Sequence, residues 1–143
     1  MSFVPRSGLL VRRRFVGIGA SALAAVLLTG CGGGPSGDAA QQAAVAFVHA
    51  MLGHDGARAC SMLTTNAKSS VAGATKVSCE EAILQVDEKN APAGVVEVWG
   101  DSAQVKIGAD TIFLLSLGNG WRVDAAGCKP AAPHAPYHCD IGG

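Results

Sequence analysis

The cysteines carry the most definite chemistry in this sequence, and the first of them has a distinctive setting. Cys31 follows Leu28-Thr29-Gly30 at the end of an apolar run that starts at Phe15, directly after three arginines. A basic segment, an apolar segment and a small residue before the processing site are typical of a secretory signal peptide. A cysteine at that site is the mark of a lipobox. We therefore expect residues 1–30 to be removed and the thiol of Cys31 to be acylated.

A transmembrane anchor is the alternative interpretation of the same apolar run. The run has 14 residues, whereas a helix needs about 20 residues to span a bilayer. Two or three acyl chains on one cysteine would give lasting attachment without such a helix. Arg12-Arg13 also resembles a twin-arginine export signal, so general and twin-arginine export both stay open. Either route predicts a lipid-anchored protein on the extracytoplasmic face of the cell membrane.

The remaining cysteines are four, namely Cys60, Cys79, Cys128 and Cys139. An even number in an exported chain is typical of disulfides. Of the three connectivities, we favour Cys60 with Cys79 and Cys128 with Cys139, because each pair closes a short loop. A metal site with His134 and His138 is the rival, but the cysteines lack paired Cys-x-x-Cys spacing. We expect no metal and no other cofactor.

Few other residues could act as an acid, a base or a proton donor. A proton-transfer site needs a base and a positioned partner in a dry pocket. Glu97 is a carboxylate within a predicted strand, Arg122 lies next to Trp121, and the only tyrosine, Tyr137, is in the tail. We expect Glu97 and Arg122 on the surface, and we do not expect an enzyme.

Removal of residues 1–30 changes the charge of the protein. The sequence has 11 Lys and Arg and 11 Asp and Glu, but four of the arginines and none of the acids precede Cys31. The mature part therefore has 7 basic and 11 acidic residues, a net charge of −4. Nucleic-acid binding depends on neutralising phosphates, so we expect no nucleic-acid partner. The mature length suits one domain.

Helices are expected in the first half of the mature chain. A glycine-rich tether, residues 31–38, leads into a single domain, residues 39–143. Asp38 could cap a helix whose apolar positions recur at i, i+3, i+4 and i+7, namely Ala44, Phe47, Val48 and Met51. Asp55 is expected to cap a second helix, residues 64–71 to form a weak third, and Ser78 to cap another.

Strands are expected after Gly94, where the apolar pattern becomes alternating. They are predicted over residues 95–99, 103–107, 111–117 and 121–126, joined by turns so short that neighbours must be antiparallel. The third is almost continuously apolar and is expected to be covered on both faces. The tail adds at most a short edge strand tied back by Cys139. The predicted fold class is α+β, with helices packed on a curved antiparallel sheet of about four strands.

This layout resembles the cystatin-like roll of the nuclear transport factor 2-like superfamily over about residues 39–128. The stretch from Gly120 to Cys128, followed by Pro136-Tyr137-His138-Cys139, resembles uncharacterised lipoproteins of high-GC Gram-positive bacteria, the actinobacterial type. The resemblance implies a fold and a lipid anchor. It implies no chemistry, because the roll hosts isomerases, dehydratases, binding modules and structural domains.

Three classes of function are therefore considered. The favoured one is a non-catalytic lipoprotein that binds a partner protein or a small apolar ligand in the cone between sheet and helices, where the predicted lining is apolar. The second is a structural domain that packs its open sheet face on a copy of itself or on an envelope complex. Exposure of Trp99 and Phe113 on one face would favour it. An isomerase or dehydratase is the third.

Overall fold

The computed structural model describes residues 36–87 and 89–143. The predicted signal peptide, the acylated Cys31 and the tether up to residue 35 lie outside the described residues. Helices come first in the described part and an antiparallel sheet follows, so the predicted α+β class is confirmed.

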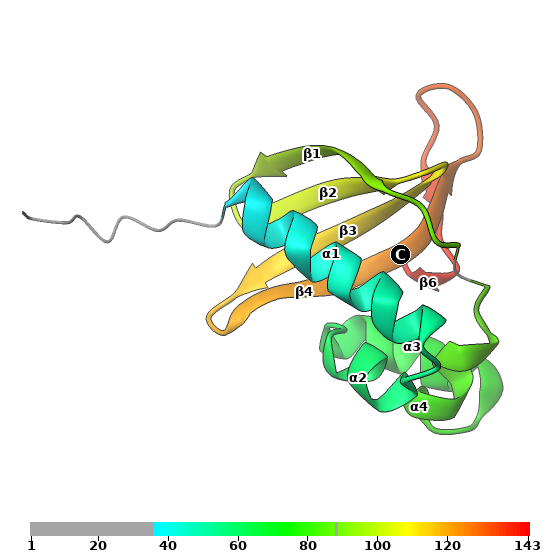
Figure 1. The fold of residues 1–143 in the computed structure, drawn as a ribbon. Coiled ribbons are helices and arrows are strands. Elements are labelled where there is room, and N and C mark those ends of the chain that lie inside the picture. The colour runs from blue at the N-terminus through cyan, green and yellow to red at the C-terminus, as the bar shows by residue number, and fades with distance from the viewer. Residues whose placement is uncertain (1–35, 88) are drawn as a thin grey trace, which may run out of the picture. The chain divides into compact units, whose positions relative to one another are not determined.

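The long helix α1 (Gly37–Leu52) lies across one face of the sheet (Figure 1). Its predicted apolar stripe is buried, as expected. Its cap is Ser36 rather than Asp38, because the Ser36 hydroxyl accepts a 3.2 Å hydrogen bond from the amide of Ala39. Asp38 lies in the first turn instead, where its charge suits the positive end of the helix dipole. Gly37 and Asp38, assigned to the tether from the sequence, thus belong to α1.

Three short helices gather near the carboxyl end of α1 (Figure 1). They are α2 (Gly56–Ser61), α3 (Thr65–Thr75) and α4 (Cys79–Ala82), and a 3-10 turn η1 (Ile83–Gln85) follows. The predicted caps Asp55 and Ser78 are present, and Thr64 caps α3, since a side-chain oxygen of each accepts an amide hydrogen bond. α3 is longer than expected and ends at Lys76, which adopts the left-handed conformation with φ of 59°.

The sheet begins as the predicted antiparallel meander. Its strands are β1 (Ala93–Trp99), β2 (Ser102–Ile107), β3 (Asp110–Leu117) and β4 (Gly120–Pro130). Two further strands, β5 (Tyr137–His138) and β6 (Ile141–Gly142), both pair with β4, so the sheet has six strands. The expectation of about four strands is therefore wrong. It allowed the tail at most one short edge strand, whereas the tail forms two, and both pair with β4 beyond or near its predicted end at residue 126.

The edge of β4 is covered along much of its length. Its second half pairs with the tail strands, and its first half meets the linker between α2 and α3. There the amide of Val123 donates to the carbonyl of Met62 at 2.9 Å, and the amide of Thr64 donates to the carbonyl of Val123 at 2.8 Å. This pairing leaves β1 as the long strand with one strand neighbour in the described sheet.

The core lies between α1 and the near face of the sheet. Its largest fully buried apolar side chains include Phe47, Ile83, Val105, Ile112, Leu114, Val123 and Ile141. On β3, Ile112 and Leu114 are buried, whereas Phe113 and Leu115 are only half-buried. The expectation that both faces of this strand are covered is therefore wrong in part. α1 covers one face, and only the tail reaches the other.

Two disulfides close the domain with the predicted connectivity. Cys60 joins α2 to Cys79 at the start of α4, with 6.1 Å between their Cα atoms. Cys128 joins β4 to Cys139 in the tail, with 4.0 Å between their Cα atoms. The first therefore holds the short helices together, and the second fixes the tail against the sheet.

Candidate functional site

The residues considered for catalysis are dispersed in the structure. Glu97 is exposed on β1, and its carboxylate accepts a hydrogen bond from the amide group of Gln104 on β2. Arg122 is half-buried on β4, and its Nη1 donates to the backbone carbonyl of Trp121 at 3.1 Å. All four histidines are exposed. Glu97 is therefore a surface residue, as expected, and the catalytic candidates do not converge on one cavity.

The cone between sheet and helices is filled by side chains. Phe47, Val48 and Met51 of α1 are buried there with Val105 of β2 and Leu114 of β3. From the sequence, we expected a ligand to bind in this space. The two hollows described next lie on outer surfaces instead.

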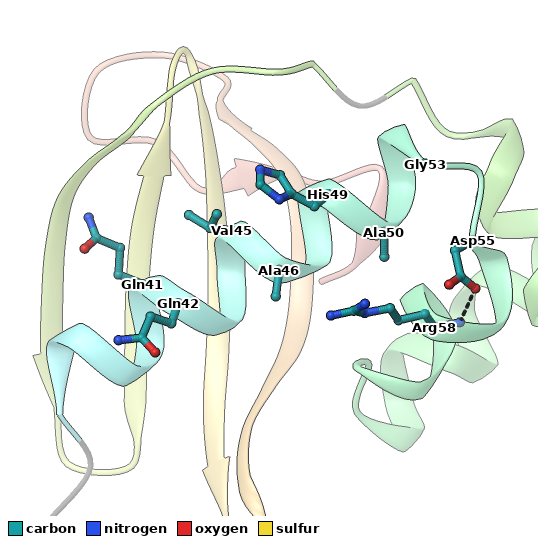
Figure 2. A pocket seen from close by; sticks show the side chains of 9 residues that line it. All are labelled: Gln41, Gln42, Val45, Ala46, His49, Ala50, Gly53, Asp55 and Arg58. Carbon is teal, nitrogen blue, oxygen red and sulfur yellow. Dashed lines mark hydrogen bonds between the residues drawn. The ribbon is translucent and has the colours of Figure 1, made fainter.

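One hollow of about 570 Å³ lies on the outer side of α1 and extends to α2 (Figure 2). It is lined by Gln41, Gln42, Val45, Ala46, His49, Ala50, Gly53, Asp55 and Arg58. The carboxylate of Asp55 is occupied as the cap of α2, accepting from the Arg58 amide at 3.0 Å. In Figure 2 the Arg58 side chain reaches toward α1, whereas the imidazole of His49 points away from the Arg58 side chain. The charged groups of this hollow thus do not converge.

A second hollow of about 330 Å³, which we call the sheet groove, lies on the face of the sheet away from α1. Side chains of the four long strands line it together with the tail, namely Trp99, Ser102, Phe113, Leu115, Asp124, Ala125, Tyr137 and Cys139. Strand register places lining residues in two rows that also contain neighbours outside the lining, namely Glu97, Gln104 and Arg122. One row is Trp99, Ser102, Leu115 and Arg122, and the other is Glu97, Gln104, Phe113 and Ala125.

The alternation of β1 explains why Trp99 points into this groove. A Cβ atom on Gly37, the first residue of α1, would lie 3.6 Å from a methyl of Val96 and 3.7 Å from a methyl of Val98. These two valines therefore face α1, and Trp99 faces the opposite side because successive strand residues alternate. Its side chain is 50% exposed. The groove thus presents a large indole that the fold does not cover.

The tail forms one wall of the sheet groove. The ring of Tyr137 meets the ring of Phe113 edge to face, with centroids 5.1 Å apart. Lys106 lies beside it, with Nζ 5.3 Å from the Tyr137 ring centroid and 3.3 Å from its hydroxyl. The same ammonium donates to the hydroxyl of Thr111 at 2.7 Å. Sequence reasoning missed this wall, although the single tyrosine two residues from a disulfide cysteine was a usable signal.

An ion pair lies at the carboxyl end of β4, where the tail strand β5 pairs with it. Lys129 Nζ is 3.2 Å from Asp110 Oδ1. That oxygen is buried and has no well-aligned hydrogen-bond donor among the described residues. The interaction is therefore an ion pair without good hydrogen-bond geometry. The contact with the Asp110 carboxylate, assisted by Asp140 and Asp87, raises the pKa of Lys129 above its ordinary value of 10.5. The pair joins β3 to β4.

The chain was also compared with family models, with curated proteins and with solved structures. None of these comparisons finds a match. Within residues 36–87 and 89–143, no group of three or more His, Cys, Asp or Glu side chains could hold a metal ion. No helix in that same part of the chain is both long enough and apolar enough to cross a membrane. The candidate site is therefore the sheet groove, on its geometry alone.

Proposed function

We propose that this protein is an exported, lipid-anchored, non-catalytic lipoprotein that binds its partner or ligand on the extracytoplasmic face of the cell membrane. The sequence around Cys31 supports the anchor. The two disulfides support an oxidising compartment. A long helix laid across an antiparallel meander supports the cystatin-like roll. In this proposal the anchor positions the domain, and the domain's surface does the binding.

The sheet groove is the observation that carries the binding role. Aromatic and aliphatic side chains line most of it, which suits a binding site with a few orienting polar groups. Its one lining carboxylate, on Asp124, accepts a 2.7 Å hydrogen bond from the hydroxyl of Thr64. That carboxylate thus has a structural partner, and so does the other titratable side chain of the lining, because the Tyr137 hydroxyl accepts a 3.3 Å hydrogen bond from Lys106. Binding is supported over proton transfer for this reason.

The anchor is tested by labelling cells with an alkyne analogue of palmitate. The native chain should take up the label and sediment with membranes. The Cys31→Ser variant should do neither, because it has no thiol to acylate. Thr29→Ser is the matched control, since it changes a neighbouring small residue and keeps the thiol. A Cys31→Ser chain that is still processed and fully retained in membranes would overturn the proposal.

Self-assembly through the outer sheet face is a second candidate. It is favoured by apolar side chains left exposed on and beside that face, with exposed fractions of 64% for Val95, 50% for Trp99 and 47% for Leu117. Such patches are often interfaces. Sedimentation of the domain from Ser36 onward tests it, because the whole core lies between Ala40 and Ile141. A concentration-dependent dimer that Trp99→Ala dissociates would support this role.

A further inference from the structure

We propose that the sheet groove binds a neutral oligosaccharide, whose rings stack on Trp99 and against the Phe113 and Tyr137 pair. This inference rests on the proposed binding function and names its ligand class. A pyranose ring has a face of C–H bonds and an edge of hydroxyls. The first suits an aromatic surface and the second suits groups that donate and accept hydrogen bonds.

The distribution of aromatic rings provides the stacking surface. The described part of the chain has five aromatic residues. Phe47 and Trp121 are buried in the core, and the other three all line the sheet groove. The π face of an aromatic ring is electron-rich and attracts positively polarised groups, which include the C–H bonds of a sugar. Trp99, half exposed, offers such a face to solvent.

Polar side chains surround these rings in the pattern that sugar hydroxyls require. Ser102 stands beside Trp99 in one row, and Gln104 stands between Glu97 and Phe113 in the next. A hydroxyl both donates and accepts, an amide offers both functions, and a carboxylate accepts. Each ring thus has hydrogen-bonding groups one strand away. An apolar molecule would offer no partner to the Ser102 hydroxyl and none to the remaining hydrogen-bonding positions of the Glu97 and Gln104 pair.

The charges around the groove favour a neutral ligand. On the outer face of the strands, the carboxylates of Glu97 and Asp124 are balanced by the cations of Lys106 and Arg122. The mature chain has 7 basic and 11 acidic residues, so its overall field disfavours phosphate-rich polymers and anionic lipid headgroups. Neither the local nor the overall charge would attract an anion.

The size of the groove favours a short oligosaccharide over a protein surface. Its volume of about 330 Å³ falls at the lower end of the range of about 300–1,000 Å³ that ligand sites occupy. A stable protein interface buries about 800 Å² on each partner. Here the polar pair of Glu97 and Gln104 borders the rings and interrupts the apolar surface. A chain of sugar rings could cross the groove and replace the water at that pair with its own hydroxyls, which an apolar protein surface could not do.

The test is titration calorimetry of the domain from Ser36 onward with soluble pentamers of N-acetylglucosamine, glucose and mannose. At least one should bind saturably, and Trp99→Ala should weaken that binding roughly tenfold or more. Trp99→Phe keeps a ring and should stay within roughly threefold of the native affinity. Leu117→Ala is the matched control, because Leu117 is 47% exposed and lies outside the groove.

Intrinsic fluorescence gives a second readout, because the two tryptophans differ in exposure. Trp99 is 50% exposed and Trp121 is 7% exposed. A bound pentamer should protect only the Trp99 emission from iodide quenching. An unchanged Trp121 emission in Trp99→Ala shows that this variant is folded. If that variant does not fold, loss of iodide protection in Tyr137→Ala takes its place as the test.

Three outcomes would overturn the glycan assignment. They are the absence of saturable binding to all three pentamers, equal binding by Trp99→Ala, and a Trp99-dependent dimer whose formation excludes sugar. The last would assign the face to a second copy and leave the broader binding role in place. Failure of fatty-acid labelling at Cys31 would instead refute the anchor and say nothing of the groove. The two proposals therefore fail separately.

Discussion

Thr64 donates a 2.7 Å hydrogen bond from its hydroxyl to Oδ1 of Asp124, which joins the start of α3 to β4. The same hydroxyl oxygen accepts from the amide of Ala67 at 3.2 Å and so caps α3. Thr64 is only 6% exposed, and its backbone amide also donates to Val123. The side chain of Thr64 thus caps a helix and holds a carboxylate beside the sheet groove, and its backbone amide closes a sheet edge.

Replacing Thr64 should separate these roles from simple packing. Thr64→Val keeps the shape but removes the hydroxyl, so it leaves the Asp124 carboxylate and the Ala67 amide without a partner. We expect it to lower the free energy of unfolding by about 2 to 4 kcal/mol. Thr64→Ser is the control and should lose less than about 1 kcal/mol, because it keeps both hydrogen bonds. Urea unfolding of both variants measures the difference, and equal midpoints would contradict the assigned role.

Two helical glycines should respond to alanine in opposite directions. A Cβ atom on Gly56, the first residue of α2, would overlap the backbone carbonyl of Glu80. A Cβ atom on Gly73, in α3, would meet nothing within 4 Å. We expect Gly56→Ala to destabilise the domain by about 1 to 3 kcal/mol through overpacking. Gly73→Ala should stabilise it by up to about 1 kcal/mol, as helix propensity predicts.

Thermal or urea unfolding of the two variants measures the change in stability of each. The two values can be compared directly, because both variants carry the same glycine-to-alanine substitution. A stabilised Gly56→Ala would show that α2 and α4 can move apart at little cost. A destabilised Gly73→Ala would show that propensity does not govern α3.

Local patterns made much of the fold predictable. The stripe from Ala44 to Met51 predicted α1, and Asp55 and Ser78 were identified as caps because capping depends on residues three positions apart. The meander followed from alternation and short turns. The start of α1 was misplaced because Ser36 and Asp38 both suit a cap. Only the structure shows that Ser36 accepts the hydrogen bond.

The tail could not be predicted in the same way. β5 and β6 have two residues each, too few to show any periodicity. They form because Ile141 is fully buried and Cys139 is bound to Cys128. Both features depend on residues outside the two short strands. The sheet groove was predictable only in part, because one of its walls is the tail. Alternation placed Trp99 and Phe113 on one face, and the position of Tyr137 two residues before Cys139 was the only signal that the tail would close the groove.

The two disulfides should stabilise the domain similarly but act on different regions. Protein isolated without reductant should show no free thiol on the four cysteines by mass spectrometry. Replacing either pair by alanine should lower the free energy of unfolding by about 3 kcal/mol, from the loop lengths in the chain-entropy model. The first pair is 19 residues apart and the second 11.

Near-ultraviolet circular dichroism distinguishes the two pairs, since the protein has one tyrosine. Cys128→Ala with Cys139→Ala should weaken the tyrosine signal, because Tyr137 lies on the tail that this disulfide fixes. Cys60→Ala with Cys79→Ala is the matched control and should leave the signal intact. An unchanged tyrosine signal in both variants would show that strand pairing alone holds the tail.

The ion pair between Lys129 and Asp110 predicts a dependence of stability on alkaline pH. Contact with the Asp110 carboxylate raises the pKa of Lys129 above 10.5. The folded state therefore keeps this proton at pH values where the unfolded state releases it. The stabilisation is fully present below the unfolded pKa and is lost as pH rises through the folded pKa. Lys129→Met should thus be less stable than the native chain at neutral pH, and the difference should vanish at high pH.

Unfolding midpoints measured from about pH 8 to pH 12 test this sign. Lys89→Met is the matched control, because Lys89 is exposed and makes no ion pair within the described residues. Its difference from the native chain should be small and should not converge as Lys129 titrates. A Lys129→Met difference that persists or grows above the raised pKa would show that the aliphatic stem of Lys129, rather than its charge, joins β4 to β3.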